Sequence, residues 1–155
     1  MRIKIYAVGS IKEKYWVDAI DEYTKRISPY SKIEIIEVDD LSMKGKSDEQ
    51  IKDKECDSIL SKIKPNEFVC NLDLNKKEYD SVSFSSKLME MIEKGGASLS
   101  FVIGGSLGIS EKMKQRANES ISLSKMTFTH QMSRVILLEQ IYRAFKINKG
   151  EPYHK

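Results

Sequence analysis

The chain has 155 residues, of which 40% are hydrophobic and 32% charged, and its formal net charge is +3. This length fits one domain over residues 1–155 whose core needs no disulfide or metal to stabilise it. Cys56 and Cys70 stand alone, without a metal-ligand spacing or a Cys-x-x-Cys motif. The opening apolar run is too short for a signal peptide, and no stretch has the length of a membrane span. We therefore expect a cytoplasmic protein with no metal site and no membrane partner.

Charge is unevenly distributed along the chain. Residues 1–111 hold 17 Lys and Arg against 20 Asp and Glu, a net of −3, whereas residues 112–155 hold 9 against 3, a net of +6. A basic end suits a polyanionic partner, because phosphates that are neutralised by Lys and Arg release counterions. On charge alone, a solvated basic face without a partner is an equal alternative.

The first part of the chain alternates between strand and helix patterns. Residues 2–9 alternate apolar and other side chains and predict a strand, whereas apolar residues at helical spacing over 15–27 predict a helix that Pro29 ends. Residues 32–38 predict a second strand. The polar run at 39–46 predicts a loop, which we expect to be mobile.

The same alternation continues through the middle of the chain. Ser47 and Gln50 form the pattern of a capping box, which predicts that a helix begins there. Residues 67–74 predict a third strand, Ser83 is a candidate cap for the following helix, and residues 98–103 predict a fourth strand.

A glycine-rich turn, Gly104-Gly105-Ser106-Leu107-Gly108, follows the fourth strand; a short helix over 110–117 and a fifth strand from Ile121 come next. Strands that alternate with helices indicate an α/β fold with a mostly parallel sheet and helices on both faces. Ligands of such sheets bind where strands lead into helices, so this turn is the first candidate site. Its spacing is neither that of a Rossmann motif nor that of a P-loop, so a tight turn without a ligand accounts for it equally well.

The last third of the chain predicts a short strand or loop at 122–128 and a helix from Thr129 to about Ile147, which Gly150 ends. Apolar residues spread around most of this helix rather than along one stripe. This pattern suggests burial against its own domain on one side and against a second chain on another. The alternative is a central helix in a monomeric core.

Two segments, FVIGGSLG at 101–108 and LSKMTFTHQMSRVILLEQIYRAFKINKGEPYHK at 123–155, resemble the bacterial large-subunit rRNA pseudouridine N3-methyltransferases of the SPOUT class. The opening AVG and KYW agree, so the resemblance covers nearly the whole chain. Thr129 stands where many relatives have proline, and both residue types suit a helix start.

The resemblance implies a C-terminal trefoil knot, a homodimer, and S-adenosyl-L-methionine (SAM) as the cofactor. The cofactor-binding residues that it implies are Leu72, Gly104, Leu123, Ser124, Lys125, Met126, Thr127 and Phe128.

The implied substrate is a pseudouridine in a stem-loop of 23S rRNA, methylated at N3 on the assembled ribosome, with free RNA as the alternative. The tail could complete the site of its own protomer or that of its partner. The protein then mainly aligns the reacting groups, which contributes about 7–11 kcal/mol. Because N3 carries a proton at neutral pH, a general base or an anion-stabilising group would help. The candidate catalytic residues are Tyr153, His154 and Arg143, whereas we expect His130 to orient the last helix.

Each of these candidates also has a simpler role open to it. Glu139 and Arg143 stand four apart and could form only a salt bridge, and Tyr153 and His154 could be a frayed terminus. The whole chain could instead be a non-catalytic RNA-binding module. A nucleotide hydrolase would need metal-binding carboxylates at strand ends, where Asp73 is the one plausible residue.

Overall fold

The computed structural model describes residues 1–42 and 45–155, in which strands and helices alternate as predicted. The strands are β1 (Arg2–Val8), β2 (Lys32–Val38), β3 (Val69–Lys77), β4 (Ser98–Ile103) and β5 (Glu119–Ile121). The helices are α1 (Lys14–Ile27), α2 (Asp48–Leu60), α3 (Ser81–Lys94), α4 (Glu111–Arg116) and α5 (His130–Asn148). The loop expected at 39–46 contains residues 43 and 44, which lie outside the described residues, and its mobility stays a prediction.

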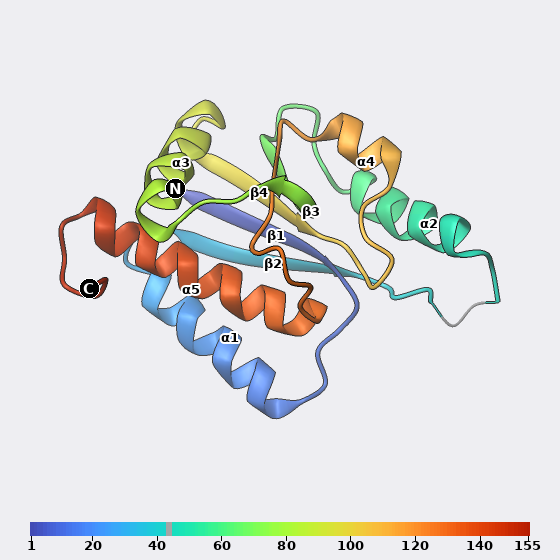
Figure 1. The fold of residues 1–155 in the computed structure, drawn as a ribbon, viewed down its shortest axis with the longest axis horizontal. Helices are drawn as coiled ribbons and strands as arrows, with labels where there is room; N and C mark the ends of the chain where they lie inside the picture. Colours follow the sequence, from blue (N-terminus) through green and yellow to red (C-terminus); the bar gives the residue numbers. More distant parts are fainter. Residues whose placement is uncertain (43–44) are drawn as a thin grey trace.

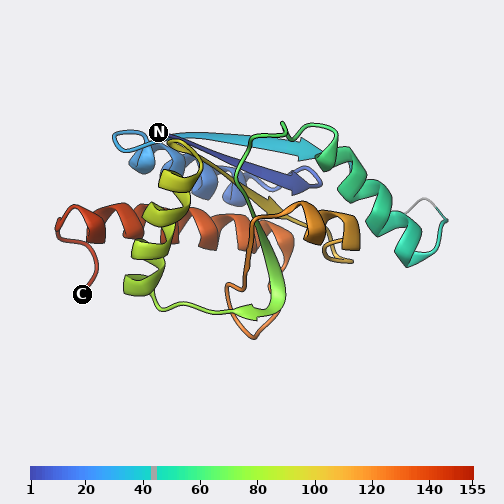
Figure 2. The same ribbon diagram turned by 90° about the horizontal axis from the view of Figure 1, so that it is seen from above.

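The strands form one sheet in the order β2-β1-β4-β3-β5, and every pair of neighbours is parallel. Helices α1, α3 and α5 cover one face, and α2 and α4 cover the other (Figures 1 and 2). The predicted α/β fold is therefore confirmed, whereas the trefoil knot stays a prediction. Because all strands run the same way, their carboxyl ends lie along one edge of the sheet.

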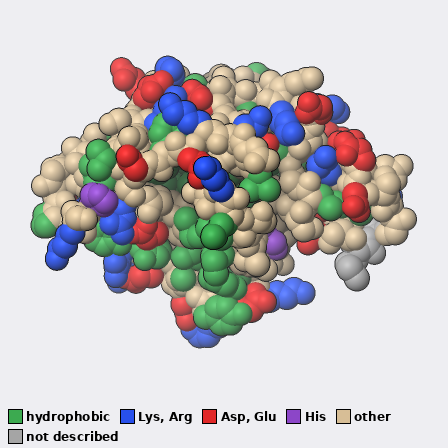
Figure 3. Space-filling view, viewed as in Figure 1, with side chains coloured by type: hydrophobic (Ala, Val, Ile, Leu, Met, Phe, Trp, Pro, Cys, Tyr) green, Lys and Arg blue, Asp and Glu red, His purple; other side chains and the backbone are tan. Residues whose placement is uncertain are grey.

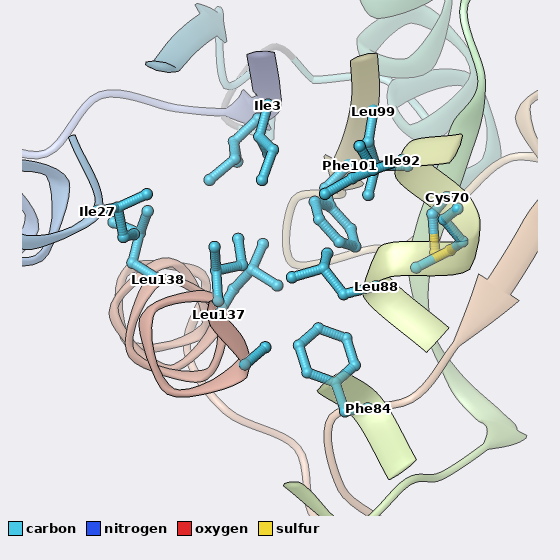
Figure 4. Close-up of a cluster of buried hydrophobic side chains, with 14 of the residues drawn as sticks. Ile3, Ile27, Cys70, Phe84, Leu88, Ile92, Leu99, Phe101, Leu137 and Leu138 are labelled. Atoms are coloured by element: carbon cyan, nitrogen blue, oxygen red, sulfur yellow. The ribbon is translucent and has the colours of Figure 1, made fainter. Parts of the chain in front are cut away.

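Side chains of β1 alternate between two cores. Ile3, Ile5 and Ala7 belong to the core under α1, α3 and α5, whereas Tyr6 and Val8 belong to the core under α2 and α4. This period of two is the pattern that predicted the strand. Figure 4 shows the larger core, in which the helices contribute side chains that include Ile27, Phe84, Leu88, Leu137 and Leu138.

Most predicted helix ends are confirmed. The capping box of Ser47 and Gln50 is present, and the Thr129 hydroxyl accepts the N–H of Met132 at 3.3 Å. The prediction that Ser83 caps α3 is wrong, because the carboxylate of Asp80 accepts the N–H of Ser83 at 2.7 Å and the helix begins earlier. Aspartate and serine are both good caps, so the sequence did not separate them.

The fifth strand lies earlier in the chain than predicted. β5 ends at Ile121, where the strand was expected to begin. The N–H of Ser122 donates to the carbonyl oxygen of Lys77 at 3.0 Å, and the N–H of Lys76 donates to the Ser122 hydroxyl at 2.8 Å. These bonds extend β3 three residues beyond the predicted end at 74 and leave 122–128 as a loop.

Helix α5 packs between α1 and α3 and against the sheet, and its buried side contains Leu137, Ile141 and Phe145. Burial against its own domain is thus confirmed. On the outer side, Met132 is 40% exposed. Figure 3 shows hydrophobic side chains gathered in a band over the first halves of α5 and α1, where Tyr15 is also exposed.

Candidate functional site

The glycine turn after β4 lies at the edge of the sheet where the parallel strands end. Gly104 has no room for a side chain, because a Cβ there would lie 2.6 Å from the carbonyl oxygen of Gly108. Gly108 has a φ of +89°, in the left-handed region that favours glycine. Gly104 and Gly108 are therefore required by the turn itself, whether or not a ligand binds to it.

A buried carboxylate supports this turn from behind. Glu55 of α2 is 2% exposed and accepts the N–H of Leu41 at 2.9 Å. Its Oε1 lies 3.0 Å from the position that a Cβ on Gly105 would take. Burial raises the pKa of the Glu55 carboxyl, which Leu41 partly opposes. Glu55 therefore connects the segment after β2 to the glycine turn, a role that the sequence did not reveal.

The loop at 122–128 is held against the end of β3. The hydroxyl of Ser122, which is buried, donates to the carbonyl oxygen of Asp73 at 2.7 Å. Further along, the N–H of Met126 donates to the Ser124 hydroxyl at 3.0 Å. The first contact holds the loop against β3, and the second lies within the loop itself.

A cavity of about 530 Å³ lies between the glycine turn, the end of β3 and this loop. Seven of the eight residues predicted to bind the cofactor line it: Leu72, Gly104, Leu123, Ser124, Met126, Thr127 and Phe128. Lys125 is exposed and lies outside this lining. The structure thus brings nearly all of the predicted residues together, in a volume typical of small-molecule sites. Their part in cofactor binding stays a prediction.

His130, the first residue of α5, also lines this cavity. Its Cε1 lies 3.3 Å from the place of a Cβ on Gly9, whose φ of +90° also favours glycine. Its Nδ1 is buried and has no hydrogen-bond partner within the described part of the chain. Burial, with the charge of Arg134, lowers the pKa of His130, although Asp40 opposes this shift. His130 is thus a neutral side chain that packs between α5 and β1.

The lowered pKa of His130 predicts that folding stability decreases below pH 6.5, the ordinary imidazole value. The unfolded chain takes up the proton at a higher pH than the folded chain, so acidification through this window favours unfolding. We expect His130→Gln to lose less stability than the wild type between about pH 7 and about pH 5.5. Urea denaturation at each pH measures this, and equal losses would mean that His130 does not titrate there.

Arg134 is buried one turn further along α5 and was not predicted as part of the site. Its Nη1 lies 2.6 Å from Oε2 of Glu37, and its Nη2 donates to the carbonyl oxygen of Gly9 at 2.6 Å. Both partners lie at the carboxyl ends of β1 and β2. Arg134 therefore ties α5 to the sheet edge next to His130.

The C-terminal tail folds back on α5 and is not frayed. Tyr153 donates its hydroxyl to Oε1 of Glu139 at 3.1 Å and packs edge-on against Tyr142, with ring centroids 4.8 Å apart. Arg143 forms the expected ion pair with Glu139 and lies over the Tyr153 ring. Its Nη1 is also 3.2 Å from Nδ1 of His154. The three predicted catalytic residues thus meet beside α5.

These contacts set the hydrogen-bonding roles of the tail side chains. Guanidinium groups only donate, so Nδ1 of His154 accepts from Arg143 and the imidazole proton lies on Nε2. Burial and the bond to Glu139 raise the pKa of Tyr153 to about 12. Tyr153 is therefore a neutral phenol at neutral pH, and His154 presents a free N–H donor.

A second cavity, of about 670 Å³, lies beside the first and shares Leu123 and Phe128 with it. His154 lines this second cavity, together with Gln140 of α5 and the start of α3. The sequence did not predict it, because its walls come from segments that lie far apart in the chain. Ser81 was the hardest of these cavity residues to predict, because a serine at the start of a helix is usually a helix cap.

The sequence model of the family described as "Predicted SPOUT methyltransferase" matches residues 1–154. The parallel sheet with helices on both faces agrees with that match. In the parts of the chain that the structure describes, no helix is long and apolar enough to cross a membrane. The same residues contain no group of three His, Cys, Asp or Glu that could hold a metal ion. The chain belongs to the SPOUT methyltransferase family, whose members use SAM as the methyl donor.

Proposed function

We propose that the protein transfers the methyl group of SAM to N3 of a pseudouridine in a stem-loop of 23S rRNA, on the assembled ribosome. The main support for this proposal is that Arg143, Tyr153 and His154 lie together beside α5. They lie at a cavity that adjoins the predicted cofactor cavity. A non-catalytic RNA-binding module would need neither cavity. The basic segment 112–155 supports an RNA partner.

The first cavity suits SAM in volume and in the charge of its lining. Leu72, Leu123 and Phe128 offer apolar contacts for a planar base, and serine and threonine hydroxyls lie among them. Asp73 contributes a carboxylate, and no Lys or Arg is among the described residues that line the cavity. Such a lining tolerates the positive sulfonium and amino groups of SAM. When bound, SAM supplies an activated methyl group, so the protein mainly aligns its substrate.

The tail suits stabilisation of an anion better than removal of a proton. Methylation at N3 requires that the imide pass its proton to solvent water, which leaves negative charge on N3 and the neighbouring carbonyl oxygens. The N3–methyl bond then forms as the bond from the methyl group to the sulfur of SAM breaks, and S-adenosylhomocysteine leaves. The free Nε2–H of His154 and the charge of Arg143 can stabilise that negative charge. Tyr153 is a neutral phenol that is bonded to Glu139, so we assign it the positioning of Arg143 rather than the role of base.

Gly104→Ala is expected to abolish or strongly weaken SAM binding. The new Cβ would lie 2.6 Å from the carbonyl oxygen of Gly108 and force the turn open. Titration calorimetry with SAM measures the change, and circular dichroism checks that the variant is folded. Ser86→Ala is the control, because Ser86 is exposed on α3 and lies outside the lining of the cavity. A folded wild type that releases no heat with SAM would contradict the proposed function.

We also propose that the protein is a homodimer through the outer side of α5. Met132, in the first half of α5, is 40% exposed, and Tyr15, at the start of α1, is 66% exposed. Figure 3 shows a band of hydrophobic side chains over these parts of the two helices. A second copy that meets this band would remove it from water, which is favourable in proportion to the area covered.

Met132→Asp is expected to convert the dimer to a folded monomer, because it places a charge in the apolar contact. Sedimentation should then give 17.8 kDa in place of twice that mass. Ser86→Asp, on the exposed side of α3, is the matched control and should remain dimeric. Leu137→Asp and Ile141→Asp should unfold the chain instead, since both residues are fully buried in the domain. A wild-type monomer at micromolar concentration would overturn this proposal.

A further inference from the structure

Helix α2 supports both ends of the glycine turn. Oε1 of Glu55 lies 3.0 Å from the place of a Cβ on Gly105, so there is no room for a side chain between the turn and this carboxyl group. At the other end, Sγ of Cys56 lies 4.0 Å from the carbonyl oxygen of Gly108 and accepts the N–H of Ser110 at 3.3 Å. Two consecutive residues of α2 therefore contact the segment that joins β4 to α4.

The carboxyl group of Glu55 also holds the segment that follows β2. Its Oε2 accepts the N–H of Leu41 at 2.9 Å. Burial, together with the charge of the neighbouring Asp40, raises the pKa of Glu55, whereas hydrogen bonds from Ser42 lower the pKa of Asp40. Of these two neighbouring carboxyl groups, Glu55 is therefore the one that takes up a proton more readily.

Glu55 reaches the wall of the first cavity from outside that cavity. The three glycines of the turn line the cavity, whereas Glu55 and Leu41 lie outside its lining. The carbonyl oxygen of Gly105 accepts the N–H of Gly108 at 3.1 Å, so the position of Gly105 decides the shape of the turn. A displacement of Glu55 would therefore change the cavity wall without any contact between Glu55 and a ligand.

Packing alone does not account for a carboxyl group at this position. Glu55 is 2% exposed, and its buried neighbours on α2 are Ile51, Cys56 and Ile59. Burial of a carboxyl group costs free energy that hydrogen bonds must offset, whereas an apolar side chain would fill the same space without this cost. The groups that Glu55 contacts, the N–H of Leu41 and the glycine turn, therefore explain why a carboxyl group is there.

We propose that Glu55 is a positioning residue for the cofactor, which holds the glycine turn in the shape that binds SAM and couples this turn to Leu41. Because such coupling is reciprocal, SAM that binds against the turn should in return stabilise the hydrogen bond from Leu41 to Glu55. The inference rests on the proposed binding of SAM in the first cavity and adds a residue that acts on it from outside.

Amide hydrogen exchange of the wild type, followed by NMR, tests the coupling without any substitution. Saturating SAM should slow the exchange of the Leu41 N–H by about tenfold, although Leu41 lies outside the cavity lining. The N–H of Gly95, which donates to the carbonyl oxygen of Met91 at the end of α3, is the reference and should exchange at the same rate with and without SAM.

Two substitutions separate the positioning role from a general loss of stability. Glu55→Ala should weaken SAM binding about tenfold in titration calorimetry and abolish the effect of SAM on the exchange of Leu41. Glu55→Gln should bind SAM as the wild type does, because its amide oxygen still accepts the N–H of Leu41. In steady-state methylation of ribosomes, the loss in Glu55→Ala should appear in KM for SAM and leave kcat unchanged. Asp53→Ala, which removes a charge from the exposed side of α2, is the control.

Three results would overturn the assignment. The first is a wild type that binds SAM without a change in the exchange of Leu41, and this measurement decides even if Glu55→Ala does not fold. The second is a folded Glu55→Ala with wild-type affinity for SAM, and the third is an equal loss of affinity in Glu55→Gln and Glu55→Ala. A wild type that does not bind SAM would overturn the proposed function as well, so the two failures are distinguishable.

Discussion

Deletion of residues 153–155 is expected to reduce methylation by about 10²–10⁴-fold, while SAM binding stays unchanged. The deletion removes His154, whose Nε2–H is the proposed donor to the substrate, and the Tyr153 ring on which Arg143 lies. None of the three deleted residues lines the first cavity. The contacts of Tyr153 with Glu139 and Tyr142 contribute about 1–2 kcal/mol of stability, which a domain of this size can lose without unfolding.

Single-turnover methyl transfer to ribosomes, with saturating SAM, measures this effect. His154→Ala should account for most of the loss, whereas Tyr153→Phe keeps the ring under Arg143 and should lose less. Deletion of Lys155 alone is the control, because the tail network is formed by Arg143, Tyr153 and His154. Wild-type rates in the full deletion would mean that the tail is dispensable and that the cavity loops and α5 carry the reaction.

The sequence predicted elements whose signal is local. The strands at 32–38 and 98–103 have the predicted bounds, because their β-forming runs are closed by turn residues at both ends. The caps at Ser47 and Thr129 were also predictable, since a cap depends on residues three positions apart. The lining of the first cavity came from the family resemblance rather than from periodicity, and seven of eight residues lie where it implied.

What the sequence did not reveal depends on pairs that lie far apart in the chain. Glu55 contacts Leu41 and the glycine turn, and Ser81 meets Gln140 across 59 residues. Nothing in the local pattern around these residues distinguishes them from solvent-exposed polar side chains. A frayed terminus was one alternative for Tyr153 and His154 on the sequence alone, whereas the structure packs Tyr153 on Tyr142. Such a contact between aromatic rings stabilises a terminal residue, but a hydropathy pattern does not reveal it.

Glu37→Leu is expected to destabilise the fold by about 3 kcal/mol, at the lower end of the cost of breaking a buried ion pair. The side chain of Arg134 is 2% exposed, so the loss of the Glu37 carboxylate leaves a buried guanidinium without an anionic partner among the residues that the structure describes. The value lies at the lower end because Glu37 is 40% exposed and its pairing with Arg134 is partly solvated. Glu37→Gln, which keeps an acceptor, should cost less.

Removal of Arg134 should destabilise the fold less than removal of Glu37. Arg134→Met takes the buried charge away and leaves Glu37 free to face water, so its main cost is the lost donor to the carbonyl oxygen of Gly9, about 1–2 kcal/mol. The double variant should then be more stable than Glu37→Leu alone, because no unpaired charge remains buried. Urea denaturation of the four proteins measures the cycle. If Arg134→Met costs more than Glu37→Leu, the guanidinium acts mainly by holding the end of β1 in place, and the ion pair with Glu37 adds little to the attachment of α5 to the sheet.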